Sequence, residues 1–183
     1  MVKRVKNKII DFDLHTATIC DPYDQNSEGG MMKIVKGDLI QLALTGEFDV
    51  IIHGCNCFCA MGGGIARTIK QQFPQAYAAD LATPEGDRSK LGDFSQAAAV
   101  NDGHTITIIN AYTQYHYAGS GIKADYNAIQ RVFEKLKIRF SGRRFGYPKI
   151  GAGLAGGDWQ VISGIIDGAL QEEDHTLVEF QRS

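Results

Sequence analysis

Two glycine-rich segments, each placed between an apolar run and a helical pattern, constrain the fold of this chain most strongly. The first, His53–Arg67, contains three consecutive glycines at 62–64, and the second spans Gly151–Trp159. Glycine lets the backbone adopt positive φ and approach a ligand closely. Free N–H groups at a helix start attract anions. The pattern predicts two phosphate-binding loops, each leading from a buried strand into a helix.

The surrounding apolar pattern alternates between strand and helix. Strands are expected at Met32–Lys36, Phe48–Cys55, Phe94–Val100, Thr105–Ala111, Arg144–Ile150 and Thr176–Phe180, and helices at Gly64–Phe73, Lys123–Phe140 and Trp159–Leu170. The Asn101-Asp102-Gly103 turn indicates a hairpin. The sequence therefore predicts a three-layer α/β/α fold with a mixed central sheet. In such sheets ligands bind at the carboxyl ends of the strands.

The length and one composition break define the expected domain organisation. A chain of 183 residues fits one domain with a short extension. Residues 21–30 form a dense loop signal, and the weakly alternating segment Ile9–Cys20 before it is compatible with an edge strand. We expect residues 1–30 to form an N-terminal extension and residues 31–183 to form the functional domain.

Charge and hydropathy exclude several classes of partner. The formal net charge is −2, and no basic face stands out, so duplex nucleic acid is a poor candidate partner. No segment approaches the roughly 18 apolar residues of a membrane span, and no secretory signal follows the basic start. We therefore expect a cytoplasmic protein that does not bind a membrane.

The cysteines of such a protein are expected to be reduced. Three of the four, Cys55, Cys57 and Cys59, lie within five residues, close to His53. Zinc signatures use C-x(2–4)-C pairs with a second distant pair, which Cys20 alone does not supply. We therefore favour packing roles for these thiols over a zinc site, and we expect no metal.

A dinucleotide-binding domain is an alternative interpretation of the second loop, because Gly151, Gly153 and Gly156 match G-x-G-x-x-G. That fingerprint belongs at the first strand of a βαβ unit, and here only one helix and one strand follow. The required acidic residue would have to be Glu172 or Glu173, which precede the last strand. The context disfavours NAD-dependent chemistry, and no cofactor is expected.

A third element, Gly37-Asp38-Leu39, follows the first strand of the domain. An aspartate at a strand end can accept a hydrogen bond from an exocyclic amine such as that of adenine, although Gly-Asp is also a common turn. Two anion-binding loops favour a ligand with more than one phosphate. A diphosphate that joins two sugars would suit them.

These elements, in this order, resemble the macro domain family. The matching segments are Lys36-Gly37-Asp38-Leu39, His53-Gly-Cys-Asn56-(x5)-Gly62-Gly63-Gly64-Ile65-Ala66, and Pro148-Lys-Ile-Gly151-Ala-Gly153-Leu-Ala-Gly156-Gly157-Asp158-Trp159. The resemblance covers essentially all of residues 31–183. It implies a macro-domain fold and a small-molecule ligand, ADP-ribose or a derivative. ADP-ribosylated macromolecules are further partners that it implies.

The resemblance also implies which residues bind the ligand. Asp38, with Leu39, would contact adenine, and Asn56 would contact the distal ribose. Tyr115 or His116 would lie near the distal pocket. The diphosphate and distal ribose would be wrapped by two sets of residues: Gly62, Gly63, Gly64 and Ile65, together with Gly151, Ala152, Gly153, Leu154, Ala155 and Gly156.

Departures from the family motifs bear on the expected reaction. One hydrolase branch carries an aspartate where this chain has Ala66, and a deacylating branch has an aspartate near Ala155. The His-x-Cys-Asn-Cys start and the Gly-Gly-Gly-Ile-Ala run resemble more closely the branch that dephosphorylates ADP-ribose 1″-phosphate. We therefore expect a phosphatase. An ADP-ribosyl hydrolase, a non-catalytic ADP-ribose reader and an interaction module with a degenerate pocket remain alternatives, the last disfavoured by the intact glycines.

Three side chains are candidates for proton transfer in such a reaction. His53 stands where the buried strand meets the first loop, and imidazole titrates near neutral pH. A histidine satisfied by hydrogen bonds within the strand is the alternative interpretation. Asp158 and His116 are secondary candidates, although Asp158 is also placed to cap the next helix.

Overall fold

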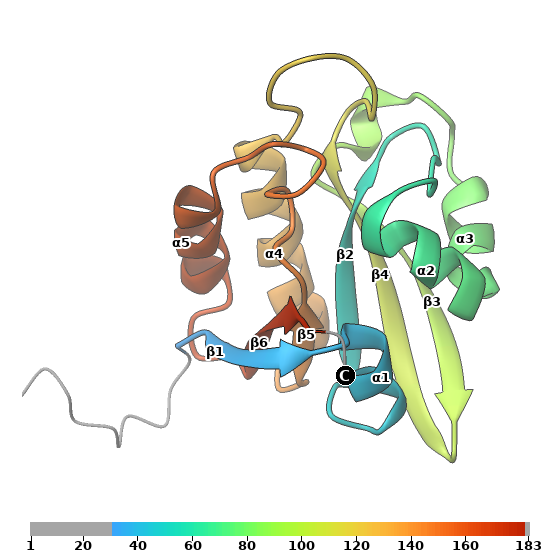
Figure 1. Cartoon of the computed structure of the whole chain (residues 1–183), viewed down its shortest axis with the longest axis vertical. Coiled ribbons are helices and arrows are strands. Elements are labelled where there is room, and N and C mark those ends of the chain that lie inside the picture. Colours follow the sequence, from blue (N-terminus) through green and yellow to red (C-terminus); the bar gives the residue numbers. More distant parts are fainter. Residues whose placement is uncertain (1–30, 182–183) are drawn as a thin grey trace, which may run out of the picture.

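A six-stranded sheet with helices on both faces forms the body of the computed structural model, which describes residues 31–181 (Figure 1). The strands are β1 (Lys33–Gly37), β2 (Val50–Asn56), β3 (Phe94–Asn101), β4 (His104–Gln114), β5 (Phe145–Tyr147) and β6 (His175–Phe180). The helices are α1 (Leu39–Leu44), α2 (Gly64–Gln72), α3 (Pro74–Leu81), α4 (Tyr126–Phe140) and α5 (Trp159–Ala169), with a short 3₁₀ helix, η1, at Arg88–Lys90. The possible strand at Ile9–Cys20 and the loop at 21–30 lie outside the described residues.

The strands are ordered β1-β6-β5-β2-β4-β3 across the sheet. All neighbouring pairs are parallel except β3 and β4, which form an antiparallel hairpin closed by the pair Asn101 and His104. The expected hairpin and the expected mixed sheet are therefore confirmed. Asp102 and Gly103 at the turn both have positive φ, as a tight hairpin turn requires.

Both faces of the sheet are covered because successive strand residues point to opposite sides. On β2, Val50 and Ile52 pack in a cluster with α4 and α5, whereas Ile51 packs in a second cluster with α1, α2 and α3. Figure 1 shows the two helix groups on opposite sides of β2. The continuous apolar run of the central strand is thus explained by burial on both faces.

Several element bounds differ from the expected ones for local reasons. The strand expected to reach Ile150 ends at Tyr147, because Pro148 has no N–H to donate to a ladder. Helix α4 begins only at Tyr126, after Asp125, whose side chain accepts a hydrogen bond from the N–H of Ala128 at 2.8 Å.

Two helices that the apolar pattern did not indicate are α1 and α3. Helix α1 has six residues and follows its cap, Asp38, directly. Helix α3 starts at Pro74, a residue expected only to end α2. Proline is well tolerated in the first turn of a helix, where its missing N–H has no partner to lose. Among residues 31–181, no helix is long and apolar enough to cross a bilayer.

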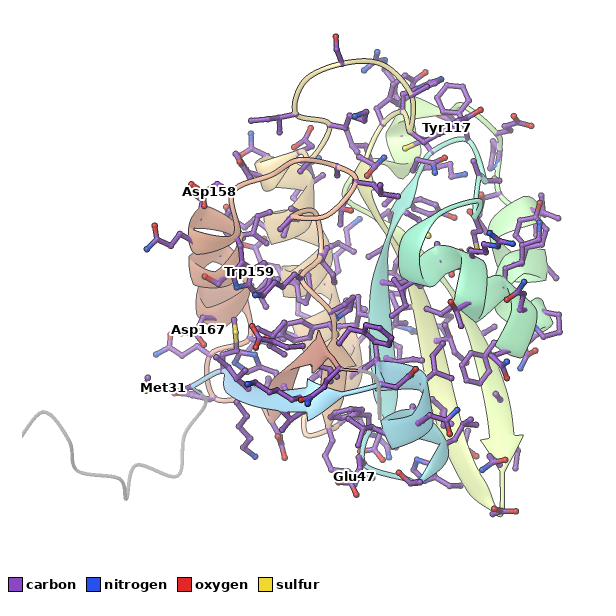
Figure 2. The ribbon with its side chains drawn as sticks, in the orientation of Figure 1. Met31, Glu47, Tyr117, Asp158, Trp159 and Asp167 are labelled. Carbon is purple, nitrogen blue, oxygen red and sulfur yellow. The ribbon has the colours of Figure 1, made fainter. Side chains whose placement is uncertain are left out.

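The topology brings four chain segments to one edge of the sheet. Strands β6, β5, β2 and β4 are neighbours and parallel, so their carboxyl ends point the same way. The loop after β5 leads to Asp158 and Trp159 at the start of α5, and the loop after β4 carries Tyr117 (Figure 2). Both glycine-rich segments therefore lie at this edge.

Candidate functional site

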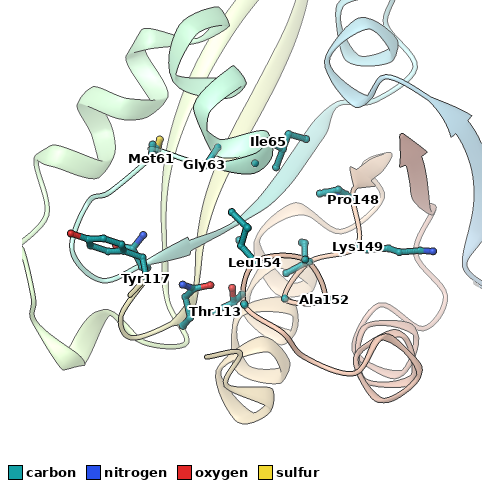
Figure 3. A pocket seen from close by; sticks show the side chains of 18 of the residues that line it. Met61, Gly63, Ile65, Thr113, Tyr117, Pro148, Lys149, Ala152 and Leu154 are labelled. Atoms are coloured by element: carbon teal, nitrogen blue, oxygen red, sulfur yellow. The ribbon is translucent and has the colours of Figure 1, made fainter. Parts of the chain in front are cut away.

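A cleft of about 1190 Å³ opens at the carboxyl ends of these four strands (Figure 3). Its walls come from β2 and the loop after it (Gly54, Asn56, 60–66), the end of β4 and its loop (Thr113, Gln114, Tyr117), the loop after β5 (148–155), the end of β6 (178–180) and the helices α2 and α3 (Lys70, Tyr77). No other described segment contributes to it.

The strand order gives the cleft two distinguishable ends. Strand β6 flanks the pair β5 and β2 on one side, and β4 flanks it on the other. Figure 3 accordingly shows Pro148 and Lys149 at one end and Tyr117 at the opposite end. We call these the β6 end and the β4 end. The two glycine-rich loops lie between them.

The first loop presents unused backbone donors to the cleft. Within the described residues, the N–H groups of Gly62, Gly63 and Gly64 donate to no acceptor. Gly63 is the N-cap of α2 and provides no capping side chain, and Gly64 has φ +53°. The start of α2 thus leaves its donors available to an anion.

The side chain of Asn56 is committed to holding this loop. Its Oδ1 accepts hydrogen bonds from the N–H of Phe58 at 2.9 Å and of Ala60 at 3.4 Å, and its Nδ2 donates to the carbonyl oxygen of Ala60 at 2.9 Å. Asn56 lines the cleft as expected. Its contact with a ribose stays a prediction, because both ends of the amide already have partners in the loop.

The second loop, like the first, has backbone N–H groups without an acceptor. The N–H groups of Gly153, Leu154 and Ala155 donate to no described acceptor. The carbonyl oxygen of Ala155 accepts hydrogen bonds from the N–H groups of Lys123 and Ala124 at 2.8 and 3.3 Å, which fixes the loop from behind. Both loops therefore have backbone donors without an acceptor on residues that line the cleft.

Glycine is required where the two loops and the cleft floor approach one another. A Cβ at Gly63 would lie 2.9 Å from Cδ1 of Leu154, which reaches across from the second loop. A Cβ at Gly54 would lie 2.8 Å from Oγ1 of Thr113 in the floor. A side chain at Gly54 would therefore clash with Thr113, which is buried and cannot move aside freely.

His53 is not brought to the cleft. It alternates along β2 with Gly54, so its ring points to the opposite face, where it is fully buried. Its Nε2 lies 2.7 Å from Oδ1 of Asn110, whose Nδ2 donates to the carbonyl oxygen of Ala76 at 2.8 Å. Burial lowers the pKa of His53 to about 4. Its geometry fits the alternative interpretation, a neutral histidine satisfied within the core.

Of the two other proton-transfer candidates, neither lines the cleft directly. Asp158 caps α5, its Oδ1 accepting a hydrogen bond from the N–H of Gln160 at 2.8 Å. His116 is exposed, and its Nδ1 accepts from the N–H of Ala118 at 2.9 Å. The His116 ring stacks on Tyr117, with centroids 4.8 Å apart. His116 is thus in contact with the β4 end of the cleft, and Asp158 is not.

The aromatic residue at the β4 end is Tyr117 and not Tyr115. The hydroxyl of Tyr115 donates to the carbonyl oxygen of Gly86 at 2.9 Å, and its ring packs edge-on against Phe58. Tyr115 therefore supports the first loop from outside. Tyr117, at 55% exposure, offers its ring to the cleft.

Asp38 and Leu39 lie beside the β6 end without lining the cleft. Leu39 is buried in the core, and Oδ1 of Asp38 caps α1 by accepting from the N–H groups of Ile40 and Gln41 at 2.8 and 3.2 Å. The register pairs Gly37 with Phe180, so Asp38 follows the strand position next to that exposed ring.

All but one of the remaining residues expected to contact the ligand line the cleft, and their contacts with a ligand stay predictions. Gly62, Gly63, Gly64, Ile65, Gly151, Ala152, Gly153, Leu154 and Ala155 all line the cleft. Gly156 does not; its positive φ of 69° serves the turn that closes the second loop.

Several lining residues were not expected from the sequence. Thr113 and Gln114 belong to β4, which runs three residues beyond its expected end at Ala111. Lys70 and Tyr77 come from the far part of α2 and from α3. Phe180 also lines the cleft and is 70% exposed. An aromatic residue at the end of the last predicted strand is the sequence signal that could have identified it as a candidate ligand contact.

The three cysteines of the first loop have separate partners. Cys55 Sγ lies 3.6 Å from Nδ1 of His53, Cys57 donates to the carbonyl oxygen of Gln114, and Cys59 donates to that of Asp80. All three are free and buried. No metal-binding group of three or more His, Cys, Asp or Glu side chains occurs in the described part of the chain.

A buried lysine fixes the outer side of the same loop. Lys90 Nζ donates to the carbonyl oxygen of Cys57 at 3.1 Å and to Sγ of Cys59 at 3.3 Å, and it lies 3.9 Å from the buried carboxylate of Asp80. Cys59 itself has φ +52°, which is uncommon for a residue with a side chain. The loop is therefore held in one conformation by contacts outside the cleft.

Comparison with curated proteins gives relatives over almost the whole described chain. An uncharacterized 17.5 kDa protein of enterobacteria phage T4 is 33% identical over 156 residues, covering 82% of this chain and 97% of the phage protein. ADP-ribose 1″-phosphate phosphatase of Candida albicans is 26% identical, covering 79% of this chain and 95% of the enzyme. ADP-ribose glycohydrolase OARD1 of Bos taurus is 25% identical, covering 86% and 95% respectively. No family model matches the sequence.

Comparison with solved structures gives macrodomains. The macrodomain of Thermus aquaticus DarG superimposes with a TM-score of 0.64 at 22% identity, covering 84% of this chain and 99% of that domain. The macrodomain of Mycobacterium tuberculosis DarG has the same TM-score at 20% identity, again covering 84% of this chain and 99% of that domain. These likenesses establish the fold.

Proposed function

Because this chain belongs to the macro domain family, we propose that its cleft binds ADP-ribose derivatives and hydrolyses the terminal phosphate of ADP-ribose 1″-phosphate. The observation that carries the proposal is that both glycine loops have unused backbone donors on residues that line one cleft. A diphosphate between the loops would satisfy donors that are otherwise unpaired within the described residues.

The two ends of the cleft suit the two ends of the ligand. At the β6 end, the exposed ring of Phe180 offers a face for stacking a purine, and Asp38 follows the neighbouring strand position. At the β4 end, Thr113 and Tyr117 border the space next to Asn56. We therefore place adenine at the β6 end and the distal ribose at the β4 end.

Phosphate release from this ligand is a monoester hydrolysis. Water attacks the terminal phosphorus, the bond from phosphorus to the ribose oxygen breaks, and that oxygen must gain a proton. The loop N–H groups would stabilise charge on the phosphoryl oxygens. His116 is the candidate proton donor, because it is the imidazole whose ring stacks on Tyr117 at the β4 end of the cleft, where the proposal places the distal ribose.

His53 has no part in this mechanism. Its ring is buried on the other face of β2, is hydrogen-bonded to Asn110 and does not line the cleft. Asp158 is likewise kept only as the cap of α5.

ADP-ribosyl hydrolysis is the second candidate, favoured by the full-length similarity to OARD1. The cleft offers little carboxylate chemistry for it. Ala66 and Ala155 stand at the positions where hydrolase branches of the family carry an aspartate. Among the described lining residues the one carboxylate is Glu179, which forms a 2.7 Å ion pair with Lys149 at the β6 end. Terminal phosphate removal is therefore proposed first.

The test combines calorimetric titration with ADP-ribose and an assay of phosphate release from ADP-ribose 1″-phosphate. We expect micromolar binding and phosphate release. His116→Ala should slow release roughly tenfold or more and leave the ADP-ribose affinity nearly unchanged. His104→Ala is the matched control, since His104 begins β4, away from the carboxyl ends of the strands, and its Nε2 donates to the carbonyl oxygen of Phe48 at 3.0 Å.

Three outcomes would change the assignment. Binding without phosphate release would favour a reader, and release of ADP-ribose from modified proteins or nucleic acid would favour a hydrolase. No binding of either ligand would mean that the glycine loops serve only the fold.

A further inference from the structure

Beyond the first glycine loop, part of the cleft wall comes from α2 and α3, and we call the space beside these helices the α2–α3 arm. Its lining residues are Met61, Ala66, Lys70 and Tyr77. Ala66 and Lys70 are one helical turn apart on the same side of α2.

Lys70 gives the arm an uncompensated positive charge. Its Nζ lies 3.7 Å from the centroid of the Tyr77 ring, and it forms no ion pair with any residue in the range 31–181. The other lysine of the cleft, Lys149, is paired with Glu179. The cation–π contact with Tyr77 holds the ammonium group without neutralising it.

The arm belongs to the β4 end of the cleft. Helix α3, which carries Tyr77, packs against β3 and β4, the strands farthest from β6. Met61 connects the arm to the glycine run, and Figure 3 shows Met61 on the same side of the pocket as Tyr117. With adenine at the β6 end, the arm lies beyond the distal ribose.

We propose that the α2–α3 arm is an anion subsite for a phosphate monoester carried by the distal ribose, and that Lys70 makes the cleft prefer the phosphorylated ligand. This inference rests on the proposed function and adds to it the selectivity of the cleft between the two ligands. A lysine suits the task because it binds phosphate as a point charge and can follow the group during hydrolysis. The loop donors also serve the diphosphate, which both forms of the ligand share, so Lys70 is the group that we expect to separate the two forms.

The test compares two ligands on three proteins. The first ligand is ADP-ribose 1″-phosphate, whose KM is measured, or its Kd if the protein does not turn it over. The second is ADP-ribose, whose affinity is measured by competition or by direct titration. Lys70→Gln should weaken the apparent affinity for the phosphorylated ligand about tenfold and change that for ADP-ribose less than about twofold.

Arg67→Gln is the matched control. Arg67 lies on the same helix one turn earlier and is exposed, but it does not line the cleft. The same loss of one positive charge should leave both affinities within about twofold, because screening weakens a charge outside the site.

Equal weakening of both ligands by Lys70→Gln, no weakening of either, or an equal effect of Arg67→Gln would each overturn the subsite while leaving the proposed function in place. Failure of the unmodified protein to bind ADP-ribose would overturn the proposed function, and the subsite with it.

Discussion

The buried imidazole of His53 should make the stability of this protein depend on pH in a way that one substitution removes. The ring is fully buried, its Nε2 faces the Oδ1 of Asn110, and its Nδ1 lies 3.6 Å from the thiol of Cys55. The neutral ring satisfies both contacts, donating from Nε2 and accepting at Nδ1. A protonated ring would carry an uncompensated charge into the core.

The size of the effect follows from the pKa. Burial lowers the pKa of His53 from 6.5 to about 4 in the folded protein, so the unfolded chain takes up a proton first as the pH falls. The contribution of the neutral ring to the free energy of unfolding is therefore complete above pH 6.5 and is lost as the pH falls towards 4. Between pH 8 and pH 5 the free energy of unfolding should fall by about 2 kcal/mol on account of this residue alone.

The assay is urea denaturation at several pH values for the unmodified protein and for His53→Gln. Glutamine can still donate to Asn110 Oδ1 but does not titrate, so the variant should lose about 2 kcal/mol less over the same pH interval. Its phosphate-release rate at pH 7.5 should stay within about threefold of the unmodified rate. Parallel stability curves for the two proteins would refute the buried neutral histidine, and a large loss of activity without a loss of binding would restore His53 as a catalytic candidate.

Three further substitutions test the framework around the site by denaturation. Gly157→Ala should cost about 1–3 kcal/mol, because the new Cβ would lie 2.9 Å from a backbone oxygen of the second loop; an unchanged midpoint would mean that the loop can shift. Asp49→Asn should cost roughly 1 kcal/mol at pH 7, since Arg144 lowers the pKa of Asp49 to about 2 through paired hydrogen bonds. The difference in stability between Asp49→Asn and the unmodified protein should disappear as the pH falls from about 4 towards 2, and a constant difference would contradict the ion pair. Lys90→Met should cost about 3–5 kcal/mol by leaving the buried carboxylate of Asp80 unpaired, and Lys90→Met with Asp80→Asn should recover part of it; no recovery would contradict the pairing.

The sequence was sufficient for the layer architecture because the signals were local. The run Val50–Ile52 indicated a strand buried on both faces, and the turn at Asn101–Gly103 indicated the hairpin. The glycine runs indicated where strands lead into helices. Each of these signals depends on a few consecutive residues, and the structure confirms all three.

The direction of single side chains was not accessible in the same way. Whether His53 or Gly54 faces the cleft depends on the register of β2, and a shift of one residue exchanges the two. Tyr115 and Tyr117 likewise differ only in which of them the loop after β4 turns inward. Such choices are settled by packing against distant residues, as with the hydrogen bond from Tyr115 to Gly86.

The contributions of α2 and α3 to the cleft wall were missed for a related reason. Lys70 joins the cleft because α3 brings Tyr77 beneath its ammonium group, and nothing in the eight residues of α3 indicates that meeting. The six residues of α1 are too few for a helical period to be recognised, and its cap, Asp38, was interpreted as a ligand contact.

The walls of the cleft come from segments that are far apart along the chain, from Gly54 to Phe180. No short fragment contains them all, so the site exists only when these strands and helices are assembled, and an occupant of the cleft binds the native state alone. A ligand of the cleft should therefore raise the melting temperature of the entire domain. At a hundredfold excess over its Kd it should add about 2.7 kcal/mol to the free energy of unfolding. Thermal-shift screening of a nucleotide library would rank candidate ligands without any assumption about the reaction.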